Sequence, residues 1–332
     1  MENTATIAPL PSIYSQALPP ASRIFGTAIS FYLNHWQIIA GISAIPFAIS
    51  LLWIFAGQSG SILLFILLGI ISFLSAFAAR LALFDAVTEN GEPQGGISGA
   101  FSRGLHFFFP FVWVSFLMGF TTLGGTFLLL IPGLLVSIWL SLSLYVLFSE
   151  GKNGMEALTA SWHYVKGFWG PVFWRLFFLG FVLAIFGFLV NLISVGPVLF
   201  SALKGGSSAP PQVPIFGQII GILYNNFFVF PLSIIYTFVI YRTLKDIKAT
   251  AVSEADEPKF KKAIMVFIVI GILGLLALAV LAGFLLSYMI EYLTNPFPSP
   301  VINPAESALN SIYSANAAAL LFSPFMQFMP WR

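Results

Sequence analysis

Seven long apolar stretches alternate with short polar segments along the chain. They are residues 36–56, 61–84, 107–130, 132–149, 172–196, 215–241 and 263–290. A hydrocarbon core of about 30 Å needs about 20 helical residues for one crossing, and all seven stretches lie near or above that length. The third and fourth are separated at Pro132 and Gly133, because proline disfavours helix in the residue before it and glycine permits a tight turn. The pattern predicts an all-α polytopic membrane protein with about seven transmembrane helices, and leaves six or eight open.

The polar segments hold a second pattern, which is most regular at residues 154–169. Apolar residues recur there at helical spacing and form one stripe, opposite a polar face. An amphipathic helix with tryptophan at its wet boundary is typical of a helix that lies in the headgroup plane. The stripe consists of Met155, Leu158, Trp162, Val165 and Trp169, and the polar face of Glu156, Thr159, His163 and Lys166.

Similar stripes occur at residues 22–36 and 98–112, and each precedes a pair of apolar stretches. The pattern predicts three amphipathic interfacial helices and is consistent with a three-fold internal repeat of interfacial helix plus helical hairpin. Amphipathic turns beside spans also arise by chance in polytopic proteins. The predicted interfacial anchors are Trp36, Trp162, Trp169 and Trp174.

Composition supports the membrane assignment. Of 332 residues, 58% are hydrophobic and only 8% are charged, whereas about a quarter are charged in ordinary soluble domains. The net charge of +2 does not indicate a nucleic-acid partner, and the absence of cysteine excludes disulfides and thiolate metal sites. The first 20 residues lack a basic and an apolar region in sequence, so no cleaved signal peptide is expected.

The distribution of Lys and Arg predicts the orientation. With a cytoplasmic N-terminus, twelve of the 14 basic residues fall in cytoplasmic segments, and only Lys204 and Arg332 fall outside. We therefore expect a multi-pass protein of the cell (cytoplasmic) membrane with an extracytoplasmic C-terminus. The predicted parts are a disordered N-terminus (1–20), a six-span domain (21–250), a charged linker (251–262), a seventh helix (263–290) and an outer tail (291–332).

Polar residues inside the spans are candidate functional positions, because each is unfavourable in hydrocarbon. Asn225 and Asn226 lie near the middle of the sixth stretch, and Gln218 lies two turns earlier. They form either a polar patch for a solute or proton relay, or an interhelical hydrogen bond, which is the favoured interpretation.

Two arginines also lie within spans. Arg80 and Arg175 are near the predicted inner ends of their stretches, from which their side chains can reach the headgroups. Asp85 is a candidate partner for Arg80, and Glu150 for Arg175.

Catalytic patterns are missing from the sequence. His35, His106 and His163 are widely separated, and the twelve carboxylates lie mostly in loops. The glycine pairs at 124–125 and 205–206 are interpreted as turns and not as phosphate-binding loops. We therefore predict no enzyme, no metal and no cofactor.

Residues 131–169, "IPGLLVSIWLSLSLYVLFSEGKNGMEALTASWHYVKGFW", carry a family resemblance. An Ile-Pro-Gly segment, a span, an acidic-Gly connector and G-x-x-A-L-x-x-S-x-x-x-V-K-G-x-W resemble the glycerophosphoryl diester phosphodiesterase membrane-domain family and YciC-like bacterial inner-membrane proteins. The resemblance covers residues 21–250 and implies a six-span membrane domain. It implies little chemistry, because no soluble phosphodiesterase domain is present. The matching positions are Pro132, Gly133, Gly154, Ala157, Leu158, Ser161, Val165, Lys166, Gly167 and Trp169.

The sequence thus favours an integral membrane protein that organises the membrane or binds lipids or partners without catalysis. A transporter or channel for a small or amphiphilic solute is the alternative, motivated by Asn225 and Asn226. The expected partners are membrane lipids and a protein bound through the tail 291–332, with no nucleic acid. The oligomeric state stays open.

Overall fold

A computed structural model describes residues 18–58, 60–203, 214–248 and 257–294. Within these ranges all regular secondary structure is helical. Seven helical segments of the described chain are long and apolar enough to cross a membrane. The prediction of an all-α polytopic protein is confirmed.

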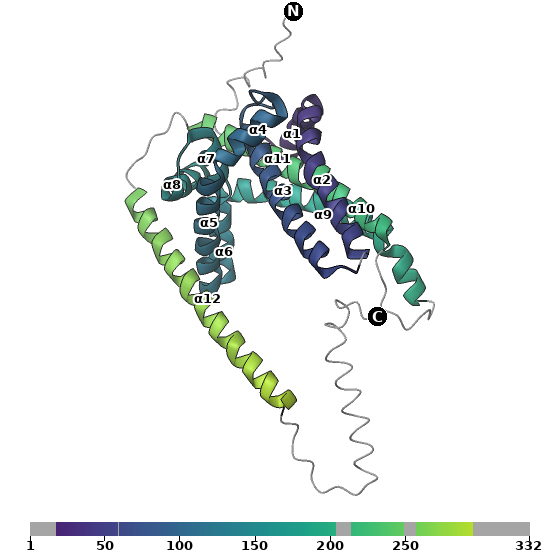
Figure 1. Cartoon of the computed structure of the whole chain (residues 1–332). Coiled ribbons are helices and arrows are strands. Elements are labelled where there is room, and N and C mark those ends of the chain that lie inside the picture. Colours follow the sequence, from purple (N-terminus) through teal and green to yellow (C-terminus); the bar gives the residue numbers. More distant parts are fainter. Residues whose placement is uncertain (1–17, 59, 204–213, 249–256, 295–332) are drawn as a thin grey trace, which may run out of the picture. The chain divides into compact units, whose positions relative to one another are not determined.

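The helices follow one another as α1 (Ala21–Asn34), α2 (Trp36–Gln58), α3 (Ile62–Thr88), α4 (Gly96–His106), α5 (Phe108–Leu128), α6 (Leu130–Leu140), α7 (Ser143–Glu150), α8 (Gly154–Val165), α9 (Trp169–Leu203), α10 (Ile215–Tyr224), the π-helical turn η2 (Asn225–Val229), α11 (Phe230–Lys248) and α12 (Glu257–Thr294). The short helices α1, α4 and α8 each precede two long apolar segments (Figure 1). The chain divides into two compact units, residues 1–199 with 213–272 and residues 200–212 with 273–332.

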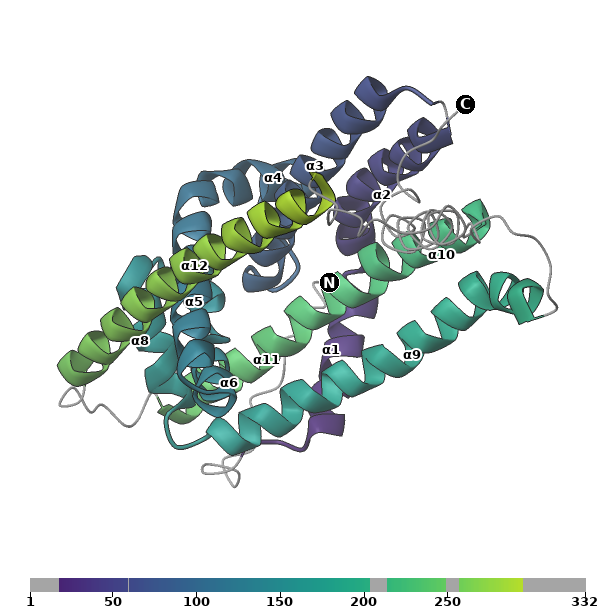
Figure 2. The same cartoon turned by 90° about the horizontal axis from the view of Figure 1, so that it is seen from below.

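The core of the first unit lies at one end of its helical hairpins. We call this end the short-helix layer, which comprises α1, α4, α7 and α8 with the adjoining ends of α3 and α11. Residues 81–87 of α3 are all buried there, and so are most of residues 234–244 of α11. Residues 62–67 of α3, at the other end of the same helix, are apolar and exposed. The hairpins extend from the layer in Figure 1, and Figure 2 shows the same helices from below. The apolar side chains that are exposed along the hairpins are suited to contact with lipid.

Two of the three short helices, α1 and α4, bury a face other than the apolar stripe that periodicity predicts, whereas α8 buries Leu158 and Val165 of its predicted stripe. In α1 the fully buried residues are Ile24 and Ala28, while Ile29 is 36% exposed. In α4 they are Ala100 and Gly104. A Cβ at Gly104 would lie only 2.8 Å from the backbone of Leu81 on α3. Helices approach most closely where side chains are smallest, so in α4 the small residues Ala100 and Gly104 define the buried face.

The turn between the third and fourth spans lies earlier than predicted. It is at Leu129, which is extended, whereas Pro132 belongs to the first turn of α6. Proline is tolerated there because its missing N–H would have no helical partner. The predicted turn at Gly124 and Gly125 is wrong, since both residues are helical in α5.

These glycines are contact points between helices. A Cβ at Gly125 would lie 2.9 Å from the Cα of Gly133 on α6. A Cβ at Gly124 would collide with the carbonyl of Phe267 on α12, and one at Gly271 with the carbonyl of Phe120 on α5. The first half of α12 therefore packs on α5 through glycine backbone.

The fourth span is broken between α6 and α7, and a side chain of α8 closes the break. The hydroxyl of Ser161 donates to the carbonyl of Trp139 (2.7 Å) and accepts from the backbone N–H of Leu142 (3.1 Å). Ser161 is fully buried. A serine in the segment with the family resemblance thus has a structural role.

The predicted outer parts are only partly described. The sequence predicts a linker through residue 262, whereas α12 already begins at Glu257. In the second unit, residues 275–294 of α12 are all exposed. Residues 1–17 of the predicted N-terminal segment and 295–332 of the predicted tail lie outside the described residues.

Candidate functional site

Arg80 lies where α3 enters the short-helix layer. Its neighbours Ala79 and Leu81 are buried, yet the side chain of Arg80 is exposed. The guanidinium carbon lies 4.3 Å from the ring centroid of Phe230 on α11. Among the described residues no carboxylate pairs with Arg80; its candidate partner Asp85 pairs with Arg103 instead.

The π-helical turn η2 lies directly before Phe230. Pro231 has no N–H to donate to the carbonyl of Phe227, four residues earlier, and its ring would clash with that carbonyl in a regular helix. The chain widens by one residue, so that the N–H of Phe230 donates to the carbonyl of Asn225. The freed carbonyl of Phe227 accepts the hydroxyl of Tyr32 from α1 at 2.8 Å.

The predicted polar residues of the sixth span bond within their own helix. The amide of Asn225 donates to the carbonyl of Gly221 (3.0 Å), and that of Asn226 to the carbonyl of Ile222 (2.9 Å). The helix-to-helix bond at this level comes from Tyr32, which sequence reasoning missed. Pro231 inside an apolar span was the available signal. Gln218 is half-buried in α10, and its backbone N–H donates to the carbonyl of Pro214.

Arg175 binds the backbone of the segment that precedes α1. Its guanidinium donates to the carbonyls of Leu18 (2.7 Å) and Pro19 (2.6 and 2.9 Å) and to that of Pro171 on α9 (2.6 Å). The candidate partner Glu150 is engaged elsewhere. Arg175 thus attaches the segment before α1 to α9.

Three of the four predicted tryptophan anchors have exposed side chains. The exposed fraction is 55% for Trp36, 50% for Trp169 and 64% for Trp174. Trp162 differs, because its indole stacks on the ring of Phe260 from α12 with centroids 4.1 Å apart.

A network around Glu150 joins α7, α8 and α11. The hydroxyls of Tyr164 and Tyr241 both donate to one carboxylate oxygen at 2.7 Å. Lys152 lies 2.9 Å and Lys245 3.3 Å from the same carboxylate. Burial, and next the hydrogen bond to Glu150, raise the pKa of Tyr164 above its ordinary value. With four donors the carboxylate is fully engaged, as expected for a structural group.

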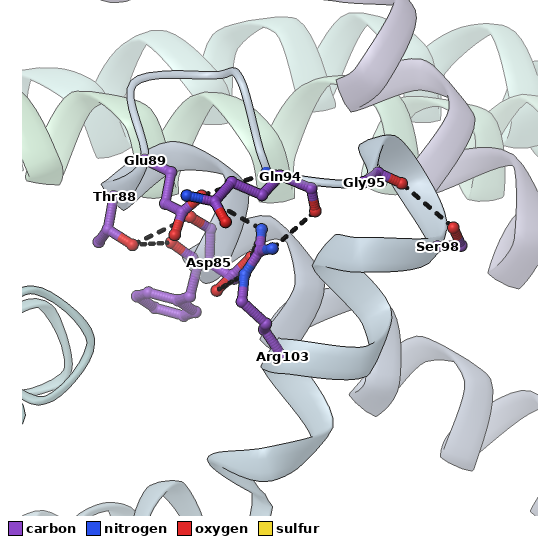
Figure 3. Close-up of polar contacts among 8 residues, drawn as sticks. Asp85, Thr88, Glu89, Gln94, Gly95, Ser98 and Arg103 are labelled. Carbon is purple, nitrogen blue, oxygen red and sulfur yellow. Dashed lines mark hydrogen bonds and ion pairs between the residues drawn. The ribbon is translucent and has the colours of Figure 1, made fainter.

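A second network joins α3 and α4 (Figure 3). Arg103 donates to Asp85 (3.0 Å), to Glu89 (3.2 Å) and to the carbonyl of Gln94 (2.6 Å). The side chain of Asp85 is only 7% exposed. The hydrogen bond to Asp85 raises the pKa of Arg103, so the guanidinium stays charged. These acidic groups close the loop between two helices.

Among the described residues, no three His, Cys, Asp or Glu side chains gather as a metal site would require. His35 contacts the carbonyl of Phe31 at 3.0 Å. The backbone carbonyl of His163 accepts from Lys248.

Comparison with known proteins adds no relative: no family model, no curated protein and no solved structure matches the chain. Of the charged groups described, Arg80 stands apart because it is exposed within a predicted span and its guanidinium lies over an aromatic ring.

Proposed function

We propose that the protein is a non-enzymatic membrane protein that binds and organises lipids of one leaflet through its short-helix layer. The observation that carries the proposal is the second apolar face of α1. One face, with Ile24 and Ala28, is buried against the protein. Ile29 and Leu33 form an exposed apolar stripe on another face, and Trp36, the first residue of α2, is also exposed. A short helix that exposes such a stripe fits the boundary between headgroups and acyl chains.

The charges at this end of the molecule support the same proposal. The described lysines and arginines all lie in the layer or at the helix ends that join it. The first turns of α12 contribute Lys259, Lys261 and Lys262, which we call the α12 basic cluster. Basic residues beside a membrane favour anionic lipids by about 1 kcal/mol each. We propose that this end faces the cytoplasm, in accord with the positive-inside bias.

Fluorescence quenching by brominated lipids tests the proposal. The full chain would be reconstituted in phosphatidylcholine vesicles containing either brominated phosphatidylglycerol or brominated phosphatidylcholine. We expect stronger tryptophan quenching by the anionic lipid, an excess that falls with added salt because exposed charges are screened. Replacing the α12 basic cluster with glutamine should reduce that excess. Equal quenching by both lipids at low salt would reject the proposal.

A transporter or channel is the second candidate, and the π-helical turn favours it. Such turns frequently occur at functional sites, and Asn225 exposes an amide there within a span. Solute flux into vesicles should be lost when Asn225 and Asn226 are both replaced by leucine. Absence of flux in the wild-type protein would reject this candidate.

Two further expectations stay proposals. Kinship with the phosphodiesterase membrane-domain and YciC-like families rests on residues 131–169 alone. A protein partner for the tail 291–332 rests on sequence, because 295–332 lie outside the described residues.

A further inference from the structure

We propose that Arg80, Phe230 and Asn226 form a binding site for one phospholipid, with the phosphate held by the guanidinium of Arg80. The inference rests on the proposed lipid-binding function and gives it a specific site. It concerns a single retained lipid molecule, whereas the basic residues of the short-helix layer act on many lipids at once.

The guanidinium of Arg80 has no acidic partner among the described residues. An arginine near the end of an apolar transmembrane helix keeps its charge, and that charge favours an anionic partner. No described carboxylate lies within ion-pair distance, and the ring of Phe230 covers the guanidinium at 4.3 Å. An aromatic ring against a guanidinium holds its plane while the N–H donors stay directed outward along the edges. That planar fork matches two oxygens of a phosphate.

The position of Arg80 along α3 sets the depth of its guanidinium in the membrane. Arg80 lies 18 residues after Ile62, the first residue of α3. At 1.5 Å per residue this is about 27 Å, close to the full thickness of about 30 Å of a hydrocarbon core. The guanidinium therefore reaches the level at which one leaflet places its phosphates.

An apolar surface extends along α3 from Arg80 into the membrane. Ala76 and Phe73 precede Arg80 by four and seven residues and lie on the same helix face. Phe73 is 70% exposed. An acyl chain covers about half of the 30 Å core, which corresponds to about ten residues of α3. Inorganic phosphate has no apolar part that could contact this surface, whereas a phospholipid has acyl chains. A phospholipid is therefore the ligand that fits.

The amide of Asn226 offers a further polar contact for the bound lipid. It lies one turn deeper than Phe230, where the glycerol esters of a lipid bound at Arg80 would follow its phosphate. One N–H of its amide is used by the carbonyl of Ile222. A carboxamide has two N–H groups, so the second can donate to an ester carbonyl.

Native mass spectrometry tests the site. The full chain would be reconstituted with equimolar phosphatidylcholine and phosphatidylglycerol, re-extracted in mild detergent, washed, and scored for retained phospholipid. We expect the wild-type protein to keep one phospholipid per chain. Arg80→Gln should lower that occupancy about tenfold, as expected for loss of a charge-assisted hydrogen bond. Arg80→Lys should retain an intermediate amount, since it keeps the charge but loses the planar fork.

Matched variants separate the site from general effects. Phe73→Ala should lower retention, whereas Phe109→Ala, which alters an equally exposed ring on α5, should not. Glutamine at Lys259 and Lys262 should leave the single retained lipid in place. If Arg80→Gln does not give a monodisperse helical protein, Asn226→Leu replaces it and should also lower retention.

Two results would overturn the site. One is equal retention by the wild-type protein and by every folded variant at Arg80, Asn226 and Phe73. The other is displacement of the lipid by inorganic phosphate, which would show that Arg80 binds free anions. Neither result depends on the quenching preference for anionic lipid, so failure of this site and failure of the proposed function are distinguishable.

Discussion

The indole of Trp162 and the ring of Phe260 stack face to face, with centroids 4.1 Å apart and planes 11° from parallel. Trp162 belongs to α8, and Phe260 belongs to the first turn of α12. Phe260 also meets Trp139 edge-on at 6.0 Å. The contact connects the six-span region that carries the family resemblance with the additional seventh helix.

A double-mutant cycle should detect this contact. Replacing Trp162 and Phe260 with leucine, singly and together, should give a coupling energy of about 1 kcal/mol, because aromatic pairs contribute about that much beyond buried area. Unfolding of the four proteins in mild detergent is the measurement. The control cycle pairs Trp162 with Phe177, a ring that contacts Trp174, and should show no coupling. Equal coupling in both cycles would contradict the stacked arrangement.

Two glycines on α5 provide a matched comparison. At Gly124 a Cβ would lie 1.8 Å from the carbonyl oxygen of Phe267, whereas at Gly119 nothing lies within 4 Å. Gly124→Ala must displace α12 and should lower the free energy of unfolding by about 1–3 kcal/mol. Gly119→Ala should be neutral or stabilise by up to about 1 kcal/mol, because alanine favours helix over glycine. Thermal unfolding of both variants decides, and equal midpoints would reject the close approach of α5 and α12.

The spans were predictable because length and apolar composition alone decide whether a helix can cross a bilayer. The division into short and long helices was also visible as a change of periodicity. The buried faces of α1 and α4 were not, because Ala28 and Gly104 give little hydrophobic signal and act by being small. The Glu150 network joins residues 91 positions apart, Glu150 and Tyr241, and no local pattern encodes such a pair.

The same limit explains Arg80. The sequence placed it near the end of a span, but its position over the ring of Phe230 depends on how α3 packs on α11, and Arg80 and Phe230 are 150 residues apart along the chain. Pro231 marked the level of the π-helical turn without indicating that Tyr32 would occupy the freed carbonyl. The candidate site is therefore a product of tertiary structure.

The two ion pairs of Arg103, with Asp85 and with Glu89, should contribute unequally to the stability of the protein. Asp85 is 7% exposed and Glu89 is 37% exposed. Arg103→Gln leaves the carboxylate of Asp85 buried without its cation and should destabilise by about 3 kcal/mol. Glu89→Gln removes a largely solvated pair and should change stability by less than about 1 kcal/mol. The double variant Asp85→Asn with Arg103→Gln should be less destabilised than the sum of the single variants. Additive losses in thermal unfolding would show that the two groups do not interact.

Tyr164 should make the stability of the protein depend on alkaline pH. Burial and the hydrogen bond to Glu150 raise its pKa in the folded state above the ordinary value of 10.0. The folded protein therefore retains this proton at a pH where the unfolded chain loses it. The contribution of Tyr164 to the free energy of unfolding is complete below pH 10 and is lost as the pH rises towards the higher folded value.

Tyr164→Phe should lower stability by about 1–2 kcal/mol at neutral pH, because Glu150 loses a donor. It should also show a shallower decline above pH 10 than the wild-type protein. Tyr288→Phe alters an exposed tyrosine and should reproduce the wild-type curve, so a parallel decline of all three proteins above pH 10 would rule out the proposed role of the Tyr164 hydroxyl.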